Sequence, residues 1–70
     1  MKLVVNGTDV EVPNDINVRQ LLTERKVKSP DMVSVELNGE ILDRPTFEKT
    51  KLKTGDKVEF LYFMGGGRGA

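Results

Sequence analysis

Residues 57–63 read KVEFLYF, and this stretch decides the fold. Successive side chains of a strand point to opposite faces, which gives one face with Val58, Phe60 and Tyr62 and another with Glu59, Leu61 and Phe63. Both faces are largely apolar, which is typical of a central strand rather than of an edge strand. We expect this strand to lie in the middle of a sheet, with one face against a helix.

Two earlier stretches predict β-hairpins, because alternating apolar residues flank an Asn-Gly dipeptide in each. The first is MKLVVNGTDVEV, residues 1–12, and the second is DMVSVELNGEIL, residues 31–42. In the first hairpin a two-residue loop would pair Leu3 with Val10, whereas a four-residue loop would pair Val5 with Val10. Both registers place the apolar side chains on one face, so the sequence leaves the register open.

A helix is predicted between the two hairpins, within PNDINVRQLLTERKVKSP, residues 13–30. Asn17 is placed to cap it, and Gln20 is placed to complete a capping box. The spacing assigns its buried face to Val18, Leu21, Leu22 and Val27, and its solvated face to Arg19, Glu24, Arg25 and Lys26. The stretch DRPTFEKTKLKTGD, residues 43–56, is expected to be an irregular connection anchored by Phe47 and Leu52.

This order of elements predicts an α+β domain over residues 1–63, with a mixed sheet of four to five strands and one main helix on one face. Residues 64–70, MGGGRGA, are expected to be a flexible tail, because glycine loses more backbone freedom than any other residue when its conformation is fixed.

The composition excludes several classes of function. Among the 70 residues there is no cysteine and no histidine, so we expect no thiol nucleophile, imidazole base or metal site, and we assign no catalytic residue. Eleven basic residues balance eleven acidic ones, which argues against a nucleic-acid partner. We find no signal peptide and no segment of transmembrane length, and therefore expect a cytoplasmic protein without a membrane partner.

The order of elements, the motifs LNGEIL (residues 37–42) and LKTGDKVEF (residues 52–60) and the di-glycine after the last strand together resemble the ThiS family. The resemblance covers residues 1–67. Members of this family are the sulfur carriers of thiamine thiazole biosynthesis, and they have the ubiquitin-like β-grasp fold. The resemblance therefore implies that the last strand lies centrally, beside the first.

The resemblance also implies a carrier rather than an enzyme. A ubiquitin-activating-enzyme-like adenylyltransferase would use ATP to adenylate the carboxylate of Gly67. Sulfur from a donor such as a cysteine desulfurase would then replace AMP, and the thiocarboxylate would pass to a thiazole synthase or another acceptor enzyme. The chain itself would bind no cofactor.

The tail and its surroundings have separate predicted roles. The glycines Gly65, Gly66 and Gly67 are narrow enough for a passage into a partner's active site, and residues 64–67 span roughly 13 Å when extended. The side chains expected to dock on the partner are Val4, Leu61, Phe63 and Met64.

The residues after Gly67 depart from the family pattern, because Arg68, Gly69 and Ala70 block the carboxylate that the chemistry needs. Three explanations remain open: removal by a processing metallopeptidase, a cloning remnant, or loss of the carrier role. The acceptor pathway is open as well, since cysteine, methionine or molybdopterin synthesis also requires sulfur. A different class of function is a non-catalytic β-grasp binding module with an unmodified tail.

Overall fold

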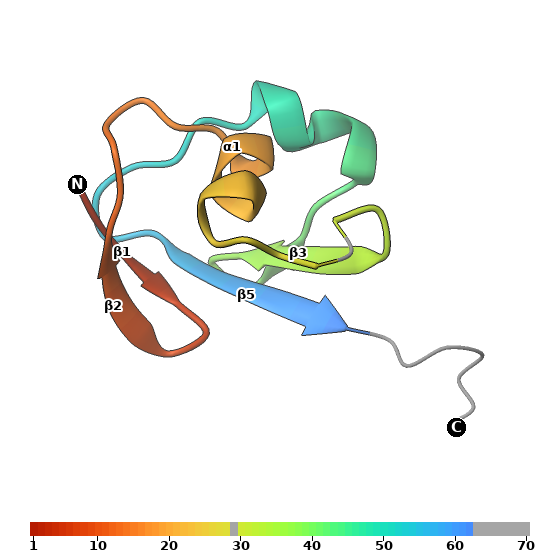
Figure 1. Cartoon of the computed structure of the whole chain (residues 1–70), viewed down its shortest axis with the longest axis horizontal. Coiled ribbons are helices and arrows are strands. Elements are labelled where there is room, and N and C mark those ends of the chain that lie inside the picture. The colour runs from red at the N-terminus through yellow and green to blue at the C-terminus, as the bar shows by residue number, and fades with distance from the viewer. Residues whose placement is uncertain (29, 63–70) are drawn as a thin grey trace.

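The computed structural model describes residues 1–28 and 30–62 (Figure 1). Its elements follow in the order β1 (Lys2–Val5), β2 (Thr8–Glu11), α1 (Val18–Glu24), β3 (Val33–Leu37), β4 (Glu40–Ile41), the 3₁₀ helix η1 (Arg44–Lys49) and β5 (Lys57–Tyr62). The strands form one mixed sheet in the order β2-β1-β5-β3-β4, and α1 lies over one face of it (Figure 1). The predicted β-grasp fold and the central position of the last strand are confirmed.

Both predicted hairpins are present, and the structure settles the register that the sequence left open. Leu3 pairs with Val10, so the first hairpin has the two-residue loop. Asn6 and Gly7 both have positive φ, at 51° and 81°, as a type I′ turn requires. The second turn repeats this conformation, with φ of 51° at Asn38 and 91° at Gly39.

Helix α1 begins as predicted, and its seven residues end before Arg25, Lys26 and Val27, which the spacing had assigned to helix faces. The side chain of Asn17 accepts a hydrogen bond of 2.7 Å from the Gln20 amide, and the Gln20 side chain accepts one of 2.9 Å from the Asn17 amide. The helix stops at Glu24, because Lys26 adopts a left-handed φ of 56°. Val27 therefore lies outside the helix, although it still packs against the core.

The connection over residues 43–56 is more regular than predicted, since it contains η1. A proline is tolerated in the first turn of a helix, and Arg44 fixes the segment from its start. The Arg44 guanidinium donates to the carbonyl oxygens of Pro30 and Val33 at 3.0 and 3.1 Å, and lies 5.8 Å from the ring centroid of Phe47. The predicted anchors Phe47 and Leu52 are buried.

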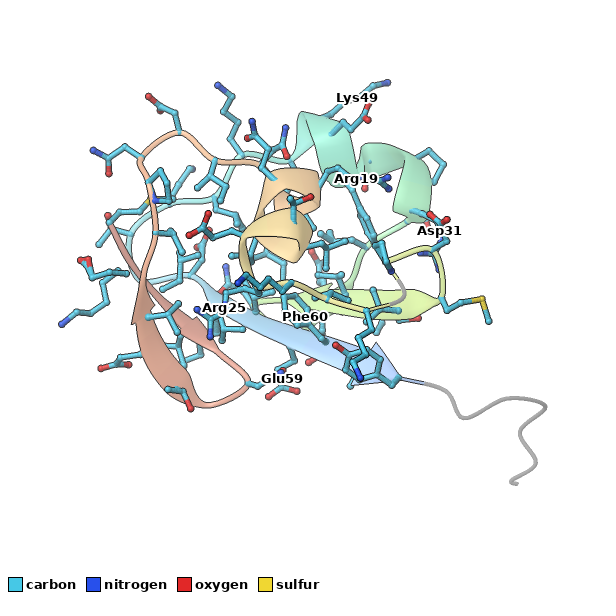
Figure 2. All side chains as sticks on the ribbon, viewed as in Figure 1. Arg19, Arg25, Asp31, Lys49, Glu59 and Phe60 are labelled. Carbon is cyan, nitrogen blue, oxygen red and sulfur yellow. The ribbon has the colours of Figure 1, made fainter. Side chains whose placement is uncertain are left out.

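The core lies between α1 and the sheet and includes Leu3, Val5, Val18, Leu21, Leu22, Val33, Val35, Phe47, Val58 and Phe60. Figure 2 shows Phe60 between β5 and α1, with Glu59 on the opposite side of the strand. Burial of β5 on the helix side ends at Phe60, because Tyr62 is 53% exposed. The prediction of an apolar helix-facing side therefore holds for Val58 and Phe60 but not for Tyr62. Within the described residues, no helix is long and apolar enough to cross a membrane.

Strand β5 is held from both sides by the asparagines of the two turns. The pairing of β1 with β5 ends at Val5 and Val58, and the Asn6 side chain then accepts a 2.9 Å hydrogen bond from the Phe60 amide. On the other side, the Asn38 side chain accepts a 2.9 Å bond from the Lys57 amide. The two side chains continue hydrogen bonding to β5 where the neighbouring backbone has turned away.

Substituting Asn6 with Gly should destabilise the fold by about 1 kcal/mol, the typical contribution of one intramolecular hydrogen bond. Glycine keeps the positive φ and removes the side-chain acceptor of the bond to Phe60, while the greater freedom of glycine in the unfolded chain adds to the loss. Asn6→Asp is the matched variant, because it keeps an acceptor oxygen and should retain most of the stability. Urea unfolding measures both, and equal stability of Asn6→Gly and the parent chain would contradict this role of Asn6.

Candidate functional site

Only two of the predicted site residues belong to the described part of the chain. These are Val4 on β1 and Leu61 on β5, both half-buried. The predictions for Gly65, Gly66, Gly67, Phe63 and Met64 lie outside the described residues, as does the predicted domain boundary after residue 63. We therefore describe the surfaces that surround the end of β5.

The outer face of the sheet, which is the face away from α1, carries both Val4 and Leu61, but the two side chains do not form one apolar patch. Val4 lies opposite Lys57 in the parallel pair, whereas Leu61 lies opposite Ser34 in the antiparallel pair. The two β5 positions are four residues apart, which is roughly 13 Å along a strand. Lys57 and Glu59 occupy the outer face between them.

Two glutamates lie directly opposite each other on this outer face. Glu36 of β3 pairs with Glu59 of β5, and Ile41 of β4, which is 59% exposed, is the next neighbour of Glu36. Like charges directly opposite each other are unfavourable in an antiparallel pair. Neither glutamate forms an ion pair within residues 1–28 and 30–62, where Arg19 and Asp31 make the one ion pair found, at 3.9 Å.

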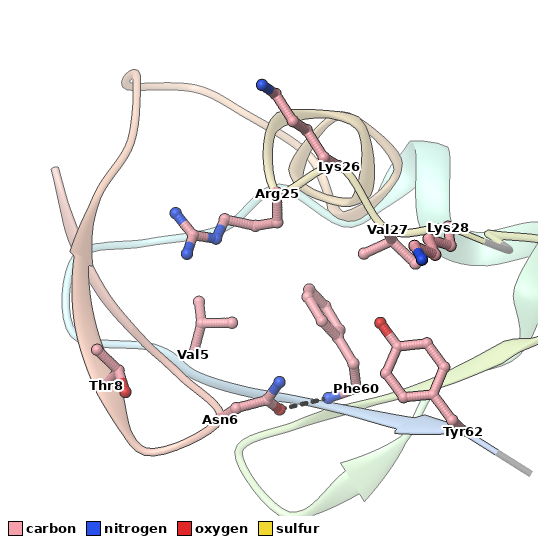
Figure 3. Close-up of a pocket in the computed structure, with 9 residues that line it drawn as sticks. All are labelled: Val5, Asn6, Thr8, Arg25, Lys26, Val27, Lys28, Phe60 and Tyr62. Atoms are coloured by element: carbon pink, nitrogen blue, oxygen red, sulfur yellow. Dashed lines mark hydrogen bonds between the residues drawn. The ribbon is translucent and has the colours of Figure 1, made fainter.

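The other side of β5 borders an open cleft of about 720 Å³ that the sequence did not reveal (Figure 3). Its lining comes from the tip of the first hairpin, from the chain after α1 and from β5, and consists of Val5, Asn6, Thr8, Arg25, Lys26, Val27, Lys28, Phe60 and Tyr62. We refer to it as the β5 cleft. Three of these residues are cations, and no carboxylate is among the described residues that line it.

The β5 cleft exists because two neighbouring elements stop short. Strand β1 leaves β5 after Val5, and the hairpin tip diverges from the sheet (Figures 1 and 3). Helix α1 ends at Glu24, and the left-handed residue Lys26 redirects the chain so that Val27 turns toward the sheet. The space between them remains uncovered.

The sequence predicted Arg25 and Lys26 to be solvated helix residues. Both are exposed as expected, but Arg25 is the C-terminal cap and Lys26 lies beyond the helix. In Figure 3 the Arg25 side chain extends from the helix end over Val5, while Lys26 points away from the cleft floor. If α1 continued beyond Glu24, the side chains of Arg25 and Lys26 would lie in other positions. Nothing in the sequence predicts a left-handed lysine at position 26, since glycine or asparagine is usual in that conformation.

The described residues place two contrasting surfaces beside β5. They contain no group of three or more His, Cys, Asp or Glu side chains placed to hold a metal ion. What they do present is an outer face with paired glutamates on one side of β5 and a basic cleft on the other, both next to the end of the strand that leads to residue 63.

Comparison with known proteins gives consistent matches. The model of the ThiS family matches residues 3–67. The crystal structure of a thiamine biosynthesis protein (ThiS) from Geobacter metallireducens is similar with a TM-score of 0.87 and 52% identity, over 96% of this chain and 100% of that one. A solution structure of a thiamine biosynthesis protein from the same organism gives a TM-score of 0.79 and 51% identity, over 97% and 90% of the two chains.

A longer curated protein is also similar. A thiazole synthase from Paramagnetospirillum magneticum is 39% identical over 67 residues, which make up 96% of this chain. The chain spans about a fifth, 20%, of the length of that relative.

Proposed function

The chain belongs to the ThiS family, and we propose on this basis that it carries sulfur for the synthesis of the thiamine thiazole. The observation that carries the proposal is the family match over residues 3–67 together with the fold shared over the full length of a thiamine biosynthesis protein. In this role the chain is a protein substrate that is loaded and unloaded by enzymes, and it is not itself a catalyst.

The sulfur is carried on the carboxylate of Gly67 in this proposal. The family match ends at this residue, which supports Gly67 rather than Gly66 as the reacting position. Residues 68–70 must then be removed before loading, and a metallopeptidase is the class of enzyme we propose for this step. The placement of β5 supports the arrangement, because the strand before the tail is fixed on both sides by Asn6 and Asn38.

The loading chemistry has two steps. A carboxylate oxygen of Gly67 attacks the α-phosphorus of ATP, the bond to pyrophosphate breaks, and an acyl-adenylate forms. In the second step the terminal sulfur of a persulfide on a donor such as a cysteine desulfurase attacks the acyl carbon and AMP leaves. A thiol reductant then cleaves the resulting acyl disulfide, which releases the thiocarboxylate and leaves a disulfide between the donor and the reductant. Activation is necessary because a free carboxylate is a poor electrophile, and a ubiquitin-activating-enzyme-like adenylyltransferase would position the terminus beside ATP.

A thiazole synthase is the acceptor that we propose for the sulfur. The support is the thiazole synthase of P. magneticum, in which a region similar to nearly all of this chain makes up a fifth of one longer protein. Covalent linkage of a carrier to its acceptor would keep the carrier at a high effective concentration near the acceptor's active site.

The first test compares the full chain with a version that ends at Gly67. With ATP, an adenylyltransferase, a sulfur donor and a thiol reductant, the shortened chain should gain one sulfur in place of one oxygen. The full chain should remain unmodified, because its terminal carboxylate lies three residues, or roughly 10 Å, beyond the reacting position. Intact-mass spectrometry distinguishes the two results.

Gly67→Ala in the shortened chain is the matched control, because it keeps the carboxylate and adds only one methyl group. It should lose most of the loading, since the methyl group displaces the reacting carbon in a narrow passage. A sulfur gain on the full chain with Ala70 still attached would overturn the assignment of Gly67.

The second test concerns docking of the outer face. Leu61→Asp should weaken binding to the adenylyltransferase by about 1–2 kcal/mol, in the range of an interface anchor. Ile41→Asp is the control, because it places the same charge on the same face at the edge strand β4. Calorimetric titration of the folded variants provides the measurement, and equal affinities of the two variants would remove Leu61 from the docking surface.

A further inference from the structure

The β5 cleft combines positive charge with an apolar floor. Val5 and Phe60 are 5% and 8% exposed and form the floor, while Val27 and the half-exposed Tyr62 stand beside them (Figure 3). Arg25 extends over this floor and forms no ion pair within the described part of the chain. A guanidinium above an apolar surface offers five donors to a carboxylate, and the surface beneath it can bury the apolar neighbour of that carboxylate.

We propose that the β5 cleft binds an acidic segment of the enzyme that receives the tail, with a carboxylate on Arg25 and an adjacent apolar side chain against Phe60 and Tyr62. The inference rests on the proposed function, in which that enzyme is a thiazole synthase. Lys28, on the rim, adds a second positive charge for the same segment, and the Tyr62 hydroxyl offers a further hydrogen-bond donor.

The position of the cleft selects this partner. Phe60 and Tyr62 are the last two residues of β5 that face α1, and the chain continues from Tyr62 to the proposed reacting residue Gly67. An enzyme that encloses the residues after Tyr62 must also approach the mouth of the cleft. The interaction would therefore add affinity for any enzyme that takes up the tail and carries the complementary acidic segment.

A protein carboxylate fits this cleft better than the phosphate of a free nucleotide. Phosphate sites in proteins are usually built from backbone amides, often at the N-terminus of a helix. The β5 cleft instead lies at the C-terminus of α1, where carbonyl groups carry the negative end of the helix dipole. Its positive charge comes entirely from exposed side chains, and such charges commonly serve association between proteins.

The helix dipole offers an alternative explanation for these cations, since the positive charges of Arg25 and Lys26 at the C-terminus of α1 stabilise the helix. Stabilising the helix does not require the Arg25 side chain to extend over Val5, which is the position that Figure 3 shows. A purely stabilising role predicts an effect on unfolding and none on binding, so the two roles can be separated.

The experiment compares Arg25→Glu with Arg19→Glu in the chain that ends at Gly67. Both variants reverse one arginine charge on or next to α1, but Arg19 does not line the cleft. Affinity for a thiazole synthase is measured by calorimetry at low and high salt, after circular dichroism and urea unfolding have confirmed that both variants are folded. Arg25→Glu should weaken binding about tenfold or more at low salt, as expected for loss of an interfacial charge pair, and Arg19→Glu should have little effect.

Arg25→Gln provides a second variant that keeps the length of the side chain and removes its charge. It should give an intermediate loss of affinity and a weaker dependence on salt than the parent chain shows. Equal affinities of the Arg25 and Arg19 variants would overturn the inference, as would binding of AMP alone in the cleft, detected by NMR shifts at Val27 and Phe60. Failure of the unsubstituted chain that ends at Gly67 both to bind the synthase and to acquire sulfur would instead overturn the proposed function.

Discussion

The fold depends on the hydrogen bonding of β5 at the points where its neighbours turn away. A central strand needs partners for its backbone on both sides, yet β1 pairs with β5 at only two positions before the Asn6-Gly7 turn begins. The Asn6 side chain supplies the acceptor for the partly buried Phe60 amide, and Asn38 does the same for Lys57. The same asparagines tolerate the positive φ of their turns, so one residue type fulfils a local and a long-range requirement.

The local requirements of the turns and of the helix cap could be predicted from the sequence, whereas the long-range requirements could not. The alternation of apolar residues and the Asn-Gly dipeptides are sufficient to predict both hairpins. The spacing of Asn17 and Gln20 is sufficient to predict where α1 begins. The end of the helix is not predictable, because lysine seldom adopts the left-handed conformation that Lys26 has here. The helix closes around it with hydrogen bonds of 3.0 Å from the Lys26 and Val27 amides to the carbonyl oxygens of Thr23 and Leu22. The helical turn at η1 was missed for a similar reason, since Arg44 fixes it through carbonyl groups that are distant in sequence.

The site was predicted less well than the fold, because its surfaces arise where elements end. Leu61 and Val4 were correctly assigned to one face by their alternation, but only the strand register reveals that Lys57 and Glu59 lie between them. The β5 cleft requires two neighbouring elements, β1 and α1, to end at particular residues, and periodicity does not determine either boundary. Its most prominent cation, Arg25, was consequently interpreted as ordinary solvated surface.

The balanced net charge of the chain conceals a separation of charge around β5. On the outer face, Glu36 and Glu59 lie closer than Lys57 to the end of β5, while Arg25 and Lys28 lie at the cleft on the face of α1. Opposite signs therefore flank the second half of the strand. Net charge governs long-range attraction, but the arrangement of charges governs the orientation in which two proteins meet. In the proposed function, a partner must place the carboxylate of Gly67 at one reacting position, which requires one orientation of the folded domain. Opposite charges on the two sides of β5 would favour one orientation, so orientation is the property we expect this arrangement to supply.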